Sequence, residues 1–125
     1  MKTASLLVSV PALFLALTVG CASKHAAGVK SNYHSQWTKV AANTVDTTNA
    51  AKAVLESHAL KGVSASSTAV DGVAKGETAD GTNVKVDVKK VDAASSEVSV
   101  TVGAMGNPTL GAEFASEIKA KAEAK

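Results

Sequence analysis

Residues 82–103 read TNVKVDVKKVDAASSEVSVTVG, and valine alternates with polar residues in both halves of this stretch. Successive side chains of a strand point to opposite faces of a sheet, so the alternation predicts two strands with one buried and one solvated face. The buried face is expected to consist of Val84, Val86, Val88, Val98, Val100 and Val102. The solvated face is expected to consist of Lys85, Asp87, Lys89, Glu97, Ser99 and Thr101.

Two further strands are expected before this pair. The dipeptides Asp71-Gly72 and Asp80-Gly81 are typical of two-residue hairpin turns, and residues 92–95 form the expected third turn. The segments between these turns predict an antiparallel meander of four strands, over residues 63–70, 73–79, 82–91 and 96–102. The first two strands contain alanine, serine and glycine in place of large alternating residues. We therefore expect them at a sheet edge or close to another element.

A helix is expected before the meander. Asp46 is a suitable N-cap for a helix over residues 47–59, which Lys61-Gly62 would end. The preceding residues, 37–45, fit either a short extended segment or the start of a longer helix. Poor helix formers around residues 44–48 favour the extended form.

A second helix is expected after the meander. Asn107-Pro108 predicts its N-cap and first residue, and its apolar stripe consists of Leu110, Phe114, Ala115, Ile118 and Ala122. Both helices need the valine face for burial. The sequence therefore predicts an α+β fold of the order α-β-β-β-β-α, with two helices packed on one face of a four-stranded antiparallel meander.

The amino-terminal segment is typical of an export signal. An apolar run over residues 6–19 follows Lys2, and it is shorter than the stretch of about 20 residues that a transmembrane helix needs. The run ends in Leu17-Thr18-Val19-Gly20-Cys21, which resembles the bacterial lipoprotein box, in which a cysteine is acylated after cleavage. This resemblance implies a signal peptide at residues 1–20 and lipidation of Cys21, the only cysteine of the chain.

The alternative is an ordinary signal peptide cut near Gly20 or Ala22, which would leave Cys21 as a free thiol or remove it. Residues 22–23 contain no aspartate, and in this they resemble lipoproteins sorted to the outer membrane. The expected location is therefore the bacterial cell envelope, on the outer membrane and facing the periplasm. Residues 21–35 are expected to form a lipidated flexible tether, and residues 36–125 the small α+β domain.

The domain resembles a known family along most of its length. The similarity covers roughly residues 45–120, and it includes the alanine-rich helix ending at Leu60, the turn at residues 78–81 with the alternating valines after it, and the closing strand at residues 96–103 before a capped helix. These features are similar to those of DUF3568, a family of small bacterial lipoproteins of unknown function. The resemblance implies a fold and a location, and it implies no activity.

The composition argues against nucleic acids and carbohydrates as partners. The formal net charge is +2, and every basic residue is lysine, so the guanidinium groups that bind phosphate and carboxylate through two hydrogen bonds are missing. Nucleic acid is therefore not an expected partner. Aromatic residues make up only 3% of the chain, which leaves little material for stacking against sugars or bases.

No catalytic arrangement is apparent in the sequence, since no nucleophile lies beside an oriented base. His58 lies near the end of a helix, where histidine is usually structural. His25 and His34 lie in the expected tether without acidic neighbours, so metal binding by them is not expected. Residues 103–107 precede a helix but lack the lysine and the glycine spacing of a phosphate-binding loop, and we expect a simple connection there.

The acidic candidates also have structural explanations. Glu113 and Glu117 are one helical turn apart, and Lys121 follows Glu117 by four residues, which is typical of a solvated, salt-bridged helix face. Asp71 and Asp80 are expected to cap backbone groups in turns and not to bind calcium. The sequence therefore predicts no catalytic, cofactor-binding or metal-binding residues.

The expected function is that of a membrane-anchored envelope lipoprotein. Its domain would act as a structural or protein-interaction module without enzymatic activity, and its partners would be the membrane, through the lipid on Cys21, and an envelope protein that the sequence does not identify. The alternative is a subunit that binds a small ligand or assists envelope transport or the stress response, with the uncovered sheet face as its site.

Overall fold

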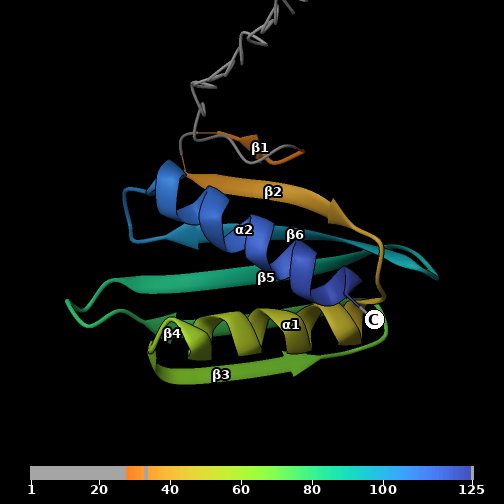
Figure 1. The fold of residues 1–125 in the computed structure, drawn as a ribbon, viewed down its shortest axis with the longest axis horizontal. Coiled ribbons are helices and arrows are strands. Elements are labelled where there is room, and N and C mark those ends of the chain that lie inside the picture. Colours follow the sequence, from red (N-terminus) through yellow and green to blue (C-terminus); the bar gives the residue numbers. More distant parts are fainter. Residues whose placement is uncertain (1–27, 33, 125) are drawn as a thin grey trace, which may run out of the picture.

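Two helices lie side by side across one face of a six-stranded antiparallel sheet (Figure 1). The computed structural model describes residues 28–32 and 34–124. Its elements are β1 (Lys30–Ser31), β2 (Ser35–Val40), α1 (Thr44–Ser57), β3 (Lys61–Ser67), β4 (Asp71–Glu77), β5 (Asn83–Asp92), β6 (Ser95–Val102) and α2 (Pro108–Glu123). The expected α+β class and the two helices on one face are confirmed. The expected number of four strands is wrong.

The two additional strands come before α1. The strand order is β1-β2-β6-β5-β4-β3, so β2 adds to the meander alongside its last strand. The extended form preferred for residues 37–45 is confirmed as far as Val40, and the helix begins at Thr44. β1 lies within residues 21–35, so the sheet begins inside the segment expected to be a tether.

Helix α1 begins three residues earlier than expected. Its N-cap is Asn43, whose side-chain oxygen accepts a hydrogen bond from the backbone N–H of Asp46 at 2.8 Å. The side-chain amide of Asn43 donates to Asp46 Oδ2 at 3.0 Å. The two side chains therefore act together in the manner of a capping box, and the expected N-cap role of Asp46 is wrong because Asn43 holds that position.

The meander forms close to its expected positions, with differences in two turns. At the β3–β4 turn the N–H of Thr68 donates to Asp71 O, and Asp71-Gly72 already belongs to β4, so the expected turn dipeptide there is wrong. At the β4–β5 turn the N–H of Gly81 donates to Thr78 O, and Gly81 has φ 88°. The connection between the two strands is five residues long, 78–82, and contains a left-handed glycine, so it is longer than the expected two-residue turn. The third turn pairs Asp92 with Ser95 as expected.

Helix α2 and the core match the expectation closely. Asn107 is the N-cap, with its side-chain oxygen accepting from Leu110 N at 3.1 Å, and Pro108 is the first helical residue. All six valines of the expected buried face are at most 2% exposed. Helix α1 covers β3 and β4, and α2 covers β2 and β6. The fully buried side chains that the helices add are mainly Leu55, Phe114 and Ile118.

Small residues allow α1 and the residues that follow it to lie close to β4. A Cβ at Gly72 would overlap Thr48 Oγ1, and a Cβ at Gly76 would lie 3.0 Å from a methyl group of Leu60. β3 is the edge strand of the sheet. The expectation that the first two meander strands lie at an edge or close to another element is therefore confirmed for both.

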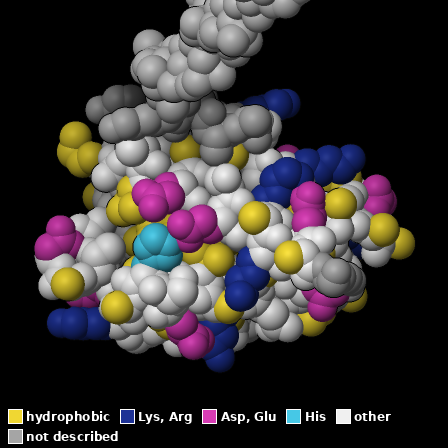
Figure 2. Space-filling view, viewed as in Figure 1, with side chains coloured by type: hydrophobic (Ala, Val, Ile, Leu, Met, Phe, Trp, Pro, Cys, Tyr) yellow, Lys and Arg dark blue, Asp and Glu magenta, His cyan; other side chains and the backbone are white. Residues whose placement is uncertain are grey.

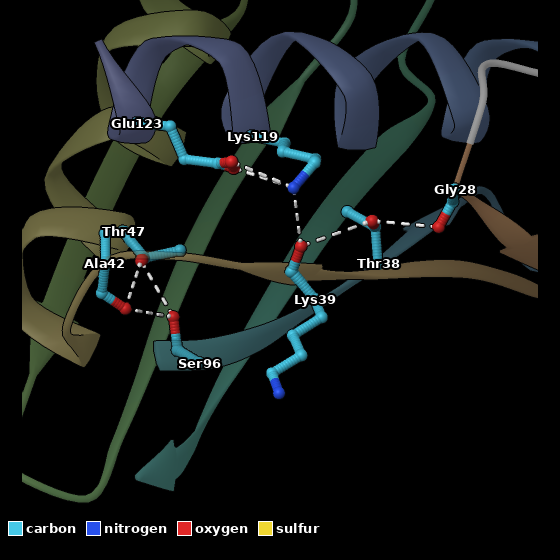
Figure 3. Close-up of polar contacts among 8 residues, drawn as sticks. All are labelled: Gly28, Thr38, Lys39, Ala42, Thr47, Ser96, Lys119 and Glu123. Carbon is cyan, nitrogen blue, oxygen red and sulfur yellow. Dashed lines mark hydrogen bonds and ion pairs between the residues drawn. The ribbon is translucent and has the colours of Figure 1, made fainter. Parts of the chain in front are cut away.

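Polar contacts connect α1 to β6, α2 to β2, and β2 to the first described residues (Figure 3). The hydroxyl groups of Thr47 and Ser96 share a buried hydrogen bond of 2.8 Å, and Ser96 Oγ donates to Ala42 O at 2.9 Å. From α2, Lys119 Nζ donates to the backbone oxygen of Lys39 at 3.0 Å. The register of β2 is thus fixed by hydrogen bonds as well as by apolar packing.

Candidate functional site

The sheet face opposite the helices is uncovered within residues 28–32 and 34–124. Trp37 on β2 lies on this face, because its register partner is Ser99 of β6. Ser99 in turn pairs with Asp87 of β5. In the neighbouring row, Glu97 of β6 pairs with Lys89 of β5. We call these five residues the open-face site.

The open-face site encloses a shallow hollow of about 360 Å³, lined by Trp37, Asp87, Lys89, Glu97 and Ser99. The small side chain of Ser99 between Trp37 and Asp87 accounts for the depression. A second hollow of about 270 Å³ lies beside it over β3 and β4, and Asp87 and Lys89 line both. The site therefore offers one aromatic surface, carboxylates and an ammonium group in one shallow concavity.

The charges at this site are partly paired. Lys85 Nζ lies 3.3 Å from Asp87 Oδ1, and both side chains are partly solvated. Lys85, Lys89 and Glu97 are exposed, as expected for the solvated face, whereas Asp87, Ser99 and Thr101 are half-buried. An aromatic side chain surrounded by polar groups is typical of surfaces that bind another molecule.

Sequence reasoning missed the place of Trp37. The alternation in Ser35–Val40 puts Gln36, Thr38 and Val40 on the buried face. Two of these three residues are polar, so the sequence does not indicate which face of β2 is buried. Only the pairing of β2 with β6 places Trp37 on the open face.

On the helix-covered side, His58, Glu113 and Glu117 lie together. His58 Nε2 lies 2.6 Å from Glu117 Oε2, and the metal-binding atoms of the three side chains all lie within 4.8 Å of one another. Figure 2 shows acidic side chains beside a histidine on this side of the molecule. Glu117 pairs with His58, and no ion pair joins Glu117 to Lys121 among the described residues. The expected salt-bridged face at this position is therefore wrong.

The two turn aspartates lie at opposite ends of β4, so the fold does not bring them together. Asp71 accepts a hydrogen bond from Thr68 Oγ1 at 2.8 Å. Asp80 accepts hydrogen bonds from the hydroxyl of Thr78 and from Thr82 N, and these bonds lower the pKa of Asp80 below its ordinary value. The backbone-capping role expected of turn residues is therefore confirmed for Asp80. At the other turn the backbone N–H groups of Val70 and Asp71 donate to the Thr68 hydroxyl, so Thr68 holds the role expected of Asp71.

The remaining candidates in the described part of the chain are the connection before α2 and His34. Residues 103–107 form the connection between β6 and α2, as expected, and Gly103 N donates to Asn83 O at 2.7 Å. The backbone N–H of His34 donates to Asn32 Oδ1. Cys21, His25 and the expected signal peptide lie outside the described residues. None of the helices in the described ranges has the length and apolar character to cross a membrane.

Comparison with known proteins identifies the family. A family model described as a protein of unknown function (DUF3568) matches residues 2–121. The chain belongs to the DUF3568 family. The match covers α1, all six strands, α2 as far as Lys121 and the apolar amino-terminal segment of this DUF3568 protein. A search of curated proteins found no match.

Proposed function

We propose that this DUF3568 protein is attached to a bacterial envelope membrane by lipid on Cys21, and that its domain binds an envelope partner through the open-face site. The anchor is supported by the sequence, in which a short apolar run ends at Cys21. The family match supports it further, because the matched region includes the apolar run and Cys21. A single acyl chain gives weak membrane binding, so a stable anchor needs the multiple chains of a bacterial lipoprotein.

The connection between the anchor and the domain is short. Gly28 is the first described residue, and its carbonyl oxygen accepts a hydrogen bond from Thr38 Oγ1 at 3.0 Å (Figure 3). Six residues lie between Cys21 and Gly28, and the seven Cα–Cα steps can span at most about 25 Å. A lipid on Cys21 would therefore hold the β1–β2 edge of the sheet close to the membrane surface.

The observation that carries the binding role is the uncovered sheet face with Trp37 in its hollow. Tryptophan is enriched among the residues that contribute most to protein interfaces, and a rim of charged residues sets orientation. Asp87, Glu97 and Lys89 supply such a rim. The arrangement suits a polar protein surface with an exposed lysine or arginine that can lie over the indole ring. The proposed role is binding, without catalysis.

Photo-crosslinking in the native host tests this role. A photo-reactive amino acid placed at Ser99 should crosslink the full chain to one partner of defined mass, and the same group at Lys121, on α2, should not. Glu97→Lys changes an exposed charge at the rim and should reduce the Ser99 adduct at least about tenfold. Equal adducts from the Ser99 and Lys121 positions, or no effect of Glu97→Lys, would contradict the proposed face.

The second candidate function is binding of a small ligand, as in an accessory subunit of envelope transport or stress response. The hollow of about 360 Å³ favours it, since it lies within the usual range of ligand pockets, roughly 300–1,000 Å³. Trp37 is the only tryptophan of the chain, so its fluorescence reports directly on the site. A saturable change in Trp37 emission with envelope small molecules, lost in Ser99→Leu, would favour the ligand over the protein partner.

A further inference from the structure

His58 is held firmly at the end of α1. Its backbone N–H donates to Val54 O, and the next two N–H groups, of Ala59 and Leu60, donate to Glu56 O and Leu55 O. This is the hydrogen-bond pattern of a Schellman motif, which ends the helix at a defined residue. The imidazole also meets the buried ring of Phe114 edge to face, with ring centroids 4.8 Å apart. The backbone bonds fix the position of residue 58, and the ring contact places His58 Nε2 beside α2.

Helix α2 presents two carboxylates to this imidazole. Glu113 and Glu117 lie on either side of Phe114 in sequence and four residues apart, so they share one face of the helix. His58 Nε2 is 2.6 Å from Glu117 Oε2, and the histidine and glutamate side chains are 28% and 42% exposed. Glu113 makes no hydrogen bond or ion pair within residues 28–32 and 34–124. It is therefore free to turn toward the other two.

The pair of His58 and Glu117 alone leaves Glu113 unused. The pair of His58 and Glu117 uses one carboxylate, and a second carboxylate one helical turn away adds repulsion between like charges. A divalent cation between the three side chains would remove that repulsion and use all three groups. Zinc binds histidine nitrogen and carboxylate oxygen at about 2.0–2.2 Å, which places tetrahedral ligand atoms about 3.3 Å apart. The observed separations, from 2.6 Å to at most 4.8 Å, bracket this value.

We propose that His58, Glu113 and Glu117 form a binding site for a divalent transition-metal ion, with zinc as the best match, at the junction of α1 and α2. A histidine ligand favours zinc over magnesium and calcium, which prefer oxygen ligands alone. Three protein ligands leave the fourth tetrahedral position open to solvent or to a ligand from a partner. The site connects the two helices and is on the opposite side of the sheet from the open-face site.

Calorimetric titration of the full-length chain with zinc chloride, after removal of metal with a chelator, tests the proposal. The titration is carried out in a His25→Gln, His34→Gln background, so that the three proposed ligands contain the only histidine. We expect one zinc per chain, with affinity lowered at least about tenfold by Glu113→Gln and by His58→Gln. Glu123→Gln, on the same helix and paired with Lys119, is the matched control and should leave the affinity within about twofold.

Glu113→Gln is the decisive variant. Glu113 is exposed, so its replacement should not disturb folding, and circular dichroism of the variant verifies this. If the cluster is only an ion pair, Glu113→Gln will not change zinc binding, because Glu113 is outside that pair. Absence of zinc binding in the His25→Gln, His34→Gln background would overturn the proposal. Equal zinc affinity in that background with and without Glu113→Gln would also overturn it.

Discussion

The side-chain oxygen of Gln36 lies where the Cβ of any larger residue at Gly111 would stand. Gln36 is fully buried, and its amide nitrogen donates to Ser31 Oγ at 3.0 Å and to Asn32 O at 3.2 Å. Its oxygen has no hydrogen-bond partner among the described residues and faces the backbone of α2. One polar side chain thus joins β1, β2 and α2, and it does so only because residue 111 is glycine.

Gly111→Ala should lower the free energy of unfolding by about 1–2 kcal/mol, because overpacking at this contact costs more than the helix propensity that alanine gains. Urea denaturation measures the change. The control is the same substitution in a Gln36→Ala background, where the overlapping oxygen is gone and the effect should vanish or become stabilising. An equal loss of stability in both backgrounds would show that the Gln36 side chain is not what excludes a larger residue at position 111.

Ala59→Gly should raise the free energy of unfolding by about 0.5–1 kcal/mol, because Ala59 has φ 58°, a left-handed conformation that costs an L-residue energy and glycine none. The chain entropy that glycine adds to the unfolded state offsets only part of this gain. Ala53→Gly, inside α1, should instead lower the stability by about 1 kcal/mol. The same sign for both substitutions in urea denaturation would refute the assigned helix end.

Ser96→Ala should lower the free energy of unfolding by about 1–3 kcal/mol, because it removes the buried hydroxyl that bonds to both Thr47 and Ala42. Ser99 lies three residues later on the open face of the same strand, and Ser99→Ala should change stability by at most about 0.5 kcal/mol. Thermal unfolding of the two variants gives the comparison. A smaller loss from Ser96→Ala than from Ser99→Ala would mean that the two faces of β6 have been exchanged.

The Asp80 carboxyl should titrate in the folded protein below its ordinary value of 3.8, chiefly because the hydroxyl of Thr78 donates to it. Since the folded state holds the proton less tightly than the unfolded state, this group stabilises the protein above about pH 3.8, and the contribution is lost as pH falls through the folded pKa. Carbon-detected NMR titration should show the pKa of Asp80 rising toward 3.8 in Thr78→Val. An unchanged titration in that variant would contradict the assigned cause.

The elements predicted well from the sequence are those whose residues alternate or cap clearly. The structure confirms that the alternating valines of β5 and β6 are buried. It also confirms that α2 starts at Asn107-Pro108. Strand β2 was harder to predict, because Gln36 and Thr38 are polar and buried. Such residues carry no apolar signal, and their burial depends on hydrogen-bond partners that are distant in sequence, such as Gly28 for Thr38.

The candidate sites depend still more on the tertiary fold. His58 and Glu117 are 59 residues apart in the chain, and only the packing of α1 against α2 brings them together. The sequence alone predicts an ion pair between Glu117 and Lys121, because their spacing of four residues places them on one helix face. A partner on another element is not visible from that spacing. The position of Trp37 in the open-face site likewise follows from its pairing with Ser99 across two strands.

The central claim is that lipid on Cys21 fixes this domain to a membrane, and intact mass combined with detergent partitioning tests it most directly. The protein is isolated from its native host beside Cys21→Ala. The account predicts that the wild-type chain begins at Cys21, carries the mass of its acyl chains and enters the detergent phase, and that Cys21→Ala stays in the aqueous phase. An unmodified wild-type chain that also stays in the aqueous phase would contradict the account.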